Sequence, residues 1–163
     1  MRRVYFDASA LIKRYSQEVG TPLLNEVFER VLPTHMTCSV LGILEVVSIL
    51  ARKRNDGRLS QSLFEQAMAE FRSEVVDSEE FLPTSIDDAL LLSATGLITK
   101  HNLNATDAAI LRSALNLHQA LRAQGDDLIL WVSDKRLARA AQGEGLVVFD
   151  PEIETMSRVL EET

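Results

Sequence analysis

Four acidic residues, Asp7, Glu45, Asp107 and Asp134, occur at positions from which their side chains could act together. Asp7 follows directly after an apolar stretch that is typical of a buried strand, and Asp134 follows a second such stretch, residues 128–132. Because ligands of parallel sheets bind beyond the carboxyl ends of the strands, we expect both side chains to point into one crevice. Glu45 lies in an apolar helical stretch, and Asp107 lies near the start of a later helix.

Carboxylates that share a crevice favour one kind of chemistry. Two of them ~5 Å apart repel each other by about 3 kcal/mol at an effective dielectric constant of about 20, and a divalent cation relieves that repulsion. Mg²⁺ and Mn²⁺ prefer oxygen ligands, and such a site can activate water and stabilise the charge that develops on a phosphodiester. No arrangement of serine with histidine, or of cysteine with histidine, competes with these acids in the sequence.

Each acid also has a purely structural interpretation when it is taken alone. An aspartate between a strand and a helix, as at Asp7 and Asp134, often serves only as a helix N-cap. Asp107 could interact only with the dipole of its helix. Glu45 would be costly to bury without a partner, so its structural alternative is a buried salt bridge. The metal-site hypothesis therefore depends on all four acids meeting in one place.

The elements that must position these acids alternate along the chain. We expect strands at residues 3–6, 34–38, 80–83, 128–132 and 146–149, and helices at residues 9–17, 21–31, 39–55, 60–76, 85–100, 104–123, 134–142 and from residue 151 onward. The expected N-caps are Thr21, Ser39, Ser60, Ser85 and Thr106. Strands that alternate with helices predict an α/β fold with a parallel sheet covered on both faces.

The composition is that of an ordinary globular chain. Its 163 residues predict a single domain, residues 1–163, and its net charge of 17 − 24 = −7 argues against a protein that coats nucleic acid non-specifically. The single cysteine, Cys38, excludes an internal disulfide and indicates a reducing cytoplasmic environment. The longest apolar stretch, residues 40–51, is interrupted by Glu45 and is too short to span a bilayer, so we expect no membrane association.

Four segments in register resemble the PIN-domain family, and more narrowly its VapC-type toxins. They are residues 4–12 (VYFDASALI), 39–45 (SVLGILE), 101–111 (HNLNATDAAIL) and 132–137 (VSDKRL), the last followed by an Ala-Ala pair and by residues 145–148 (GLVV). Together they extend over nearly the whole chain in the order expected for the family. Gly42 and Ile43 depart from the polar or alanine residues that other members often carry there.

The resemblance implies a fold, an activity and a set of site residues. It implies a three-layer α/β/α fold with a central parallel sheet of about five strands, and hydrolysis of RNA with Mg²⁺ or Mn²⁺. Asp7, Glu45 and Asp107 match the core metal-binding and catalytic acids of the family, and Asp134 matches a fourth, less uniform one. Two small hydroxyl residues match supporting positions near the site, namely Ser9 and Ser133. VapC-type members also form homodimers and are inhibited by an antitoxin protein whose tail enters the active cleft.

Basic residues lie near each acid and could contact RNA phosphates. Lys135 and Arg136 are the first candidates, and Lys13 and Arg14 are further ones. The remaining basic residues close to the acids in sequence are Arg52, Lys53, Arg54, Arg58, Lys100, Arg112 and Arg139. Solvated helix faces and surface ion pairs are the alternative interpretation of these side chains.

Other functions would require different residues. A haloacid-dehalogenase phosphatase would carry a second aspartate two residues after the first, where this chain has Ser9, and a receiver domain would carry adjacent acids before it. Neither class accounts for Glu45. Two alternatives within the resemblance stay open: a PIN nuclease that processes RNA without being a toxin, and a catalytically inactive PIN-like binding module.

Overall fold

The computed structural model describes residues 2–155. The elements follow one another along the chain as β1 (Arg2–Phe6), α1 (Ala8–Tyr15), α2 (Thr21–Arg30), the 3₁₀ turn η1 (Pro33–His35), β2 (Met36–Cys38), α3 (Val40–Asn55), α4 (Gln61–Phe71), the π turn η2 (Arg72–Val76), α5 (Asp88–Ser93), α6 (Thr95–His101), α7 (Ala105–Arg122), β3 (Asp127–Trp131), α8 (Lys135–Gly143) and β4 (Val147–Phe149). Within this part of the chain no helix is long and apolar enough to cross a membrane.

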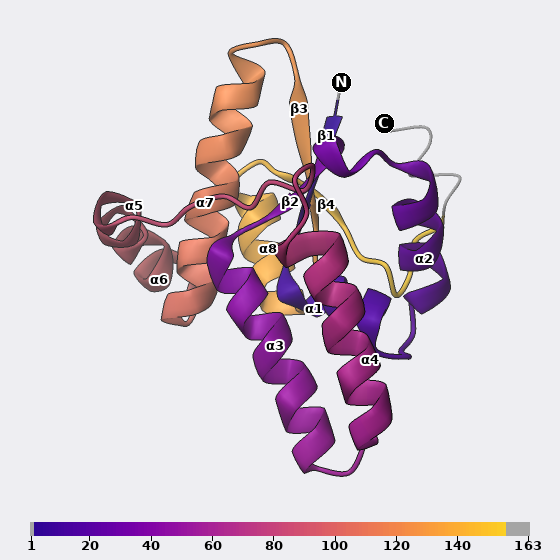
Figure 1. Ribbon diagram of the computed structural model, residues 1–163. Coiled ribbons are helices and arrows are strands. Elements are labelled where there is room, and N and C mark those ends of the chain that lie inside the picture. Colours follow the sequence, from indigo (N-terminus) through magenta and orange to yellow (C-terminus); the bar gives the residue numbers. More distant parts are fainter. Residues whose placement is uncertain (1, 156–163) are drawn as a thin grey trace.

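The four strands form one parallel sheet in the order β2-β1-β3-β4. The register pairs Phe6 at the end of β1 with Cys38 of β2 and with Trp131 of β3. The carboxyl ends of these three strands therefore lie at one edge of the sheet, as the sequence predicts for Asp7 and Asp134. Figure 1 shows the sheet between two groups of helices, with α3 and α4 forming a long hairpin that projects away from it.

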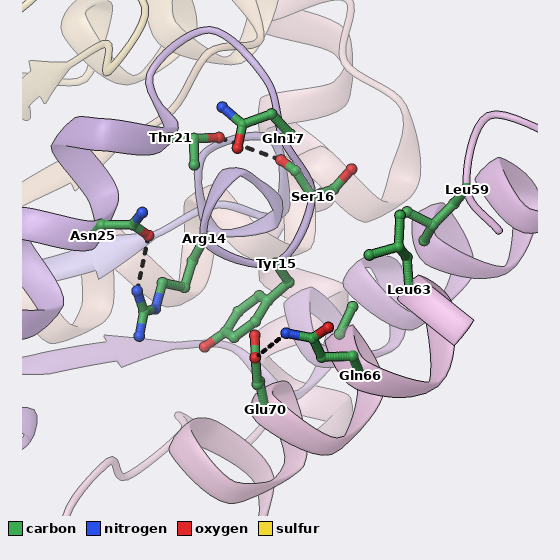
Figure 2. A pocket seen from close by; sticks show the side chains of 11 residues that line it. Arg14, Tyr15, Ser16, Gln17, Thr21, Asn25, Leu59, Leu63, Gln66 and Glu70 are labelled. Atoms are coloured by element: carbon green, nitrogen blue, oxygen red, sulfur yellow. Dashed lines mark hydrogen bonds between the residues drawn. The ribbon is translucent and has the colours of Figure 1, made fainter. Parts of the chain in front are cut away.

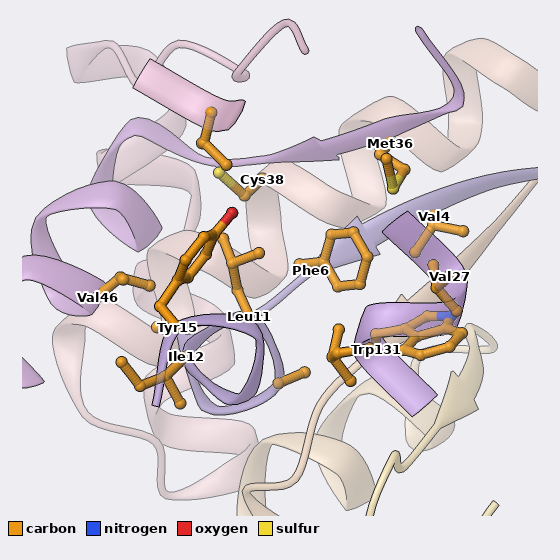
Figure 3. Packing of buried hydrophobic residues seen from close by; sticks show 14 of the residues in the cluster. Val4, Phe6, Leu11, Ile12, Tyr15, Val27, Met36, Cys38, Val46 and Trp131 are labelled. Atoms are coloured by element: carbon orange, nitrogen blue, oxygen red, sulfur yellow. The ribbon is translucent and has the colours of Figure 1, made fainter. Parts of the chain in front are cut away.

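Both faces of the sheet are buried, because successive side chains of a strand point to opposite faces. Val4, Phe6 and Trp131 face a core that α1, α2, α3 and α4 close, and Figure 3 shows their side chains packed together there. Tyr5 and Leu130 face a second core, which α6, α7 and α8 cover. The expected layers of helix, sheet and helix are therefore present, and they fix the strand ends on which the acids stand.

The sheet has four strands and not the expected five or so. The segment predicted as a strand, residues 80–83, forms no strand, and the next residue, Thr84, makes one isolated bridge with Ser39. There the Thr84 N–H donates to the Cys38 carbonyl over 2.8 Å, and the Thr84 carbonyl accepts from Val40 N–H over 3.0 Å.

Several helices begin or end at other residues than the sequence predicts. The predicted helix 85–100 is two helices, α5 and α6, and the N-cap of α5 is Asp87 rather than Ser85. Gly20, and not Thr21, is the N-cap of α2, and it has a positive φ of 92°. The helix expected from residue 151 shows only a turn at residues 151–153, and its remainder from residue 156 lies outside the described residues.

Candidate active site

Asp7 stands at the junction of β1 and α1 and serves as the N-cap of α1. Its Oδ2 accepts hydrogen bonds from the Ser9 N–H over 2.9 Å and from the Ser9 hydroxyl over 2.5 Å. The residue is only 4% exposed. Burial raises the pKa of the Asp7 carboxyl, the bonds from Ser9 oppose that rise, and the charge of Asp134 adds to it. A capping role and a functional role therefore coexist in this side chain.

Ser9 joins the ends of β1 and β3 through its hydroxyl. While Oγ donates to Asp7, it accepts from the N–H groups of Ser133 and Asp134 over 2.9 and 3.1 Å. A hydroxyl offers one donor and two acceptor positions, so its capacity is fully used. Ser9 is consequently a positioning residue that holds two acid-bearing loops together, and it has little capacity left to bind a ligand directly.

Asp134 follows β3 and is the N-cap of α8. Its Oδ1 accepts from the N–H groups of Arg136 and Leu137 over 2.8 and 2.9 Å. Because both bonds end on Oδ1, the capping role leaves Oδ2 able to bind a cation. The neighbouring Ser133 contributes its backbone N–H to Ser9, whereas its hydroxyl donates to Asp150 over 3.0 Å and so faces the end of β4.

Glu45 lies on α3, in the second turn after the N-cap Ser39, whose hydroxyl oxygen accepts from the Gly42 N–H over 2.9 Å. The side chain is half-buried. Burial raises the pKa of Glu45 to about 7, the charges of Asp7 and Asp107 contribute to that rise, and only Arg52 opposes it. The expected electrostatic coupling between Glu45 and two other acids is therefore present.

Asp107 lies in the first turn of α7, and the N-cap of that helix is Asn104 rather than the expected Thr106. Asn104 binds both the backbone and the side chain of Asp107. Its Oδ1 accepts from the Asp107 N–H and its Nδ2 donates to Asp107 Oδ2, each over 2.8 Å. Burial raises the pKa of Asp107 to about 6, with further contributions from Asp7 and Asp134 and opposition from Arg136.

All four predicted acids line one cavity of about 290 Å³. Its wall consists of Asp7, Ala8, Ser9, Glu45, Ser48, Ile49, Arg52, Asp107 and Asp134. No lysine or arginine of residues 2–155 forms an ion pair with any of the four acids. The structural alternative for Glu45, a buried salt bridge, is therefore wrong for this part of the chain.

The donor set suits a hard divalent cation, because it consists of carboxylates that raise one another's pKa values. Within residues 2–155, however, no three His, Cys, Asp or Glu side chains are already close enough together to bind a metal ion directly. A cation in this cavity would need side-chain rotation or bridging waters, and Mg²⁺ characteristically retains several waters. Mutual repulsion among the carboxylates is a physical reason for them to stand apart.

The raised pKa of Glu45, caused first by burial and then by the neighbouring acids, predicts a pH-dependent change in stability. The folded-state pKa of Glu45, about 7, exceeds the usual value of 4.5, so the metal-free protein loses stability as the pH rises from about 4.5 to about 7. We expect Glu45→Gln to raise the melting temperature in EDTA at pH 7.5 by about 2–4 °C for each kcal/mol by which the charge of Glu45 destabilises the folded protein. At pH 5, where Glu45 is already protonated, the melting temperatures of the unchanged protein and of Glu45→Gln should differ much less.

Thermal unfolding at both pH values measures this difference. Glu65→Gln on α4 is a suitable control, because Glu65 is exposed, lies outside the acidic cavity and accepts a hydrogen bond from Gln61. A melting-temperature difference that is the same at pH 5 and pH 7.5 would show that the Glu45 charge is not strained in the folded protein.

The predicted RNA contacts fall into two groups. Lys135 and Arg136 are exposed at the start of α8, beside Asp134, and Arg136 acts electrostatically on Asp107. Lys13 is instead buried at 2% exposure and pairs with Glu152 over 2.7 Å, as well as with Glu18. Lys13 as an RNA contact is therefore wrong, because its ammonium group is enclosed by its two partners.

Arg14 also points away from the acids. Its guanidinium binds Glu74 over 2.6 and 3.1 Å and the Asn25 Oδ1 over 2.8 Å, and its Cζ lies 5.4 Å from the centroid of the Phe28 ring. Figure 2 shows Arg14 with Asn25 and Tyr15 in a second cavity, of about 300 Å³, between α1, α2 and α4. These structural contacts occupy Arg14, so it is not retained as an RNA contact at the acidic cavity.

Ser48 of the cavity wall was not predicted as a site residue, and Arg52 was predicted only as one of several basic residues that could contact RNA phosphates. Both lie on α3, three and seven residues after Glu45, and residues at these spacings share a helix face. Helical periodicity counted from Glu45 could have identified them. Asn104 was missed because Thr106, two residues later, is an equally plausible cap from the sequence.

Comparisons with known proteins bear on the family and the fold. The sequence profile of the PIN domain matches residues 4–143. The fold is similar to that of PAE2754 from Pyrobaculum aerophilum, with a TM-score of 0.65 and 17% identity over the whole of both chains. It is also similar to FitAcB from Neisseria gonorrhoeae (TM-score 0.62, 14% identity, 93% of this chain and 99% of that one) and to FitAB bound to an IR36 DNA fragment (0.61, 13%, 93% and 97%). No curated protein matches the sequence.

Proposed function

We propose that this chain, which belongs to the PIN domain family, is a ribonuclease that depends on Mg²⁺ or Mn²⁺. The PIN domain is a nuclease fold. The observation that supports the proposal most strongly is that Asp7, Glu45, Asp107 and Asp134 line a single cavity although they come from distant parts of the sequence. An inactive binding module would have no need to keep four carboxylates together without a counter-ion.

The four carboxylates have different parts in this proposal. Asp7, Glu45 and Asp107 would hold the cation, partly through water, and Asp134 would complete the site. A bound Mg²⁺ or Mn²⁺ supplies activation of water and neutralisation of the charge that develops on the phosphodiester. Ser9 fixes the relative position of the loops after β1 and β3, because its hydroxyl bonds to both of them.

The RNA strand would pass over the start of α8. Lys135 and Arg136 are exposed there, next to the cavity, and their charges would offset those of the RNA phosphates. The net charge of −7 then matters less than the local distribution of charge. Phosphate contacts of this kind should make cleavage weaker as salt is added.

The proposed biological role is that of a toxin in a VapC-type toxin–antitoxin pair, supported by the resemblance of the four sequence motifs. We propose an antitoxin protein and a second copy of this chain as its partners, in the cytoplasm. Induction of the gene should then arrest growth, and Asp7→Asn should relieve that arrest. A PIN nuclease that only processes RNA would not cause the arrest.

The activity itself is tested with two pools of fluorescent, single-stranded oligonucleotides of random sequence, one of RNA and one of DNA. The proposal expects the purified protein to cleave the RNA pool with Mn²⁺ and to stop when EDTA is added. Cleavage that continues in excess EDTA, or cleavage of the DNA pool alone, would contradict it.

A further inference from the structure

The wall that α3 contributes to the acidic cavity carries a cation, Arg52, that the proposed chemistry does not yet use. The next two basic residues of that helix are engaged elsewhere. Lys53 pairs with Glu18, and the Cζ of Arg54 lies 4.5 Å from the centroid of the Phe64 ring. Of the run at residues 52–54, Arg52 alone lines the cavity.

Helix geometry explains this division. Successive residues of an α-helix are separated by about 100°, so three consecutive basic side chains leave the helix in three directions. Seven residues make about two turns, which places Arg52 on the same face as Glu45, about 10 Å further along the axis. Helical side chains lean toward the N-terminus of their helix, so the guanidinium leans back toward Glu45. In agreement, the charge of Arg52 lowers the pKa of Glu45 against the effect of burial.

The Arg52 side chain is also available to a ligand. It is exposed, and within residues 2–155 it takes part in no ion pair and no side-chain hydrogen bond. By contrast Arg58, beyond the end of the same helix, pairs with Asp56 over 2.7 Å. A guanidinium presents a planar fork of donors that matches two oxygens of a phosphate.

We propose that Arg52 binds a phosphate of the RNA strand that enters the acidic cavity, and holds that strand against the carboxylates. This rests on the proposed ribonuclease function and adds a substrate-binding residue to it. Arg52 on α3, which lines the cavity, and Arg136 on α8, whose charge acts on Asp107, would then contact the strand at two different places. A strand held at both places is better positioned for hydrolysis than one held only at α8.

The test compares Arg52→Gln, Arg52→Lys and the control Arg58→Gln, using initial rates of Mn²⁺-dependent cleavage of the random RNA pool between 50 and 200 mM salt. For Arg52→Gln we expect KM to rise about 10-fold. The slope of log(kcat/KM) against log[salt] should become shallower by about 0.7, which is the contribution of one phosphate contact on a single strand. Arg52→Lys should keep the salt slope and recover part of the loss, and Arg58→Gln should behave like the unchanged protein.

A second readout, Mn²⁺ binding measured by calorimetry without RNA, separates substrate binding from a structural role. Removing a positive charge from the cavity should leave Mn²⁺ affinity unchanged or higher, whereas damage to the site would lower it. An Arg52→Gln variant with an unchanged KM and an unchanged salt slope would overturn the inference. That result is expected if Arg52 binds a carboxylate of an inhibitory protein and not a phosphate of the RNA. If the unchanged protein cleaves no RNA, the proposed function fails as well.

Discussion

Asp7→Asn should reduce Mn²⁺-dependent RNA cleavage by at least ~10²-fold while leaving the protein folded. Asparagine has the same shape as aspartate, and its amide oxygen can still accept the bonds that Ser9 donates to Asp7. The substitution removes a negative charge that is buried at the centre of the acid group, next to Glu45, Asp107 and Asp134. The substitution should therefore weaken cation binding strongly and weaken the N-cap of α1 only slightly.

Asp87→Asn is a closely matched control for this experiment. Asp87 is also an aspartate at a helix N-cap, where it accepts from the Leu90 N–H over 2.8 Å, but it lies outside the cavity wall. Cleavage rates and melting temperatures of the two variants should be measured side by side. Similar activity in both would mean that Asp7 serves only as a cap.

The affinity for Mn²⁺ should fall about 100-fold when the pH is lowered from 7.5 to 5.5. A carboxyl group must be ionised to bind a cation, and the pKa values of about 7 for Glu45 and about 6 for Asp107 place both protonation steps in this interval. At pH 5.5 protons compete for both groups, whereas at pH 7.5 both are largely ionised. Acids with ordinary pKa values near 4 would be ionised throughout and would give almost no change.

Calorimetry at several pH values measures this dependence. Binding at pH 7 should also release about half a proton, which appears as a heat that varies with the ionisation enthalpy of the buffer. In Glu45→Gln the dependence on pH should be much weaker, because the group with the higher pKa is absent. A flat affinity between pH 5.5 and 7.5 would show that these carboxyl groups do not bind the cation.

The parts of the site that follow strands could be predicted from the sequence. Asp7 and Asp134 come after apolar strands of a parallel sheet, and the order of such strands brings their ends together. Glu45 stood out because a charged residue in an apolar helical stretch requires a reason. For these three residues the local sequence pattern was enough to predict where the side chain lies. In the structure they line one cavity together with Asp107.

Other features depend on contacts between distant residues and could not be predicted in this way. Lys13 follows Asp7 closely in sequence, yet its buried ammonium group forms an ion pair with Glu152, near the other end of the described chain. The missing fifth strand also depends on distant contacts, because the segment before Thr84 pairs with the sheet only through the single bridge between Thr84 and Ser39. The role of Arg52 could be predicted only in part. Helical periodicity places Arg52 on the same face as Glu45, but it does not show that Lys53 and Arg54 interact with other residues.

Mn²⁺ affinity at pH 7.5 in a set of single variants tests most directly whether separated acids form one cation site. The set is Asp7→Asn, Glu45→Gln, Asp107→Asn, Asp134→Asn and the control Asp87→Asn. A shared site requires at least 10-fold weaker binding in the first three variants, a smaller loss for Asp134→Asn and no change in the control. Binding that is unaffected in the first three, or lost in only one of them, would show that these carboxylates do not act together.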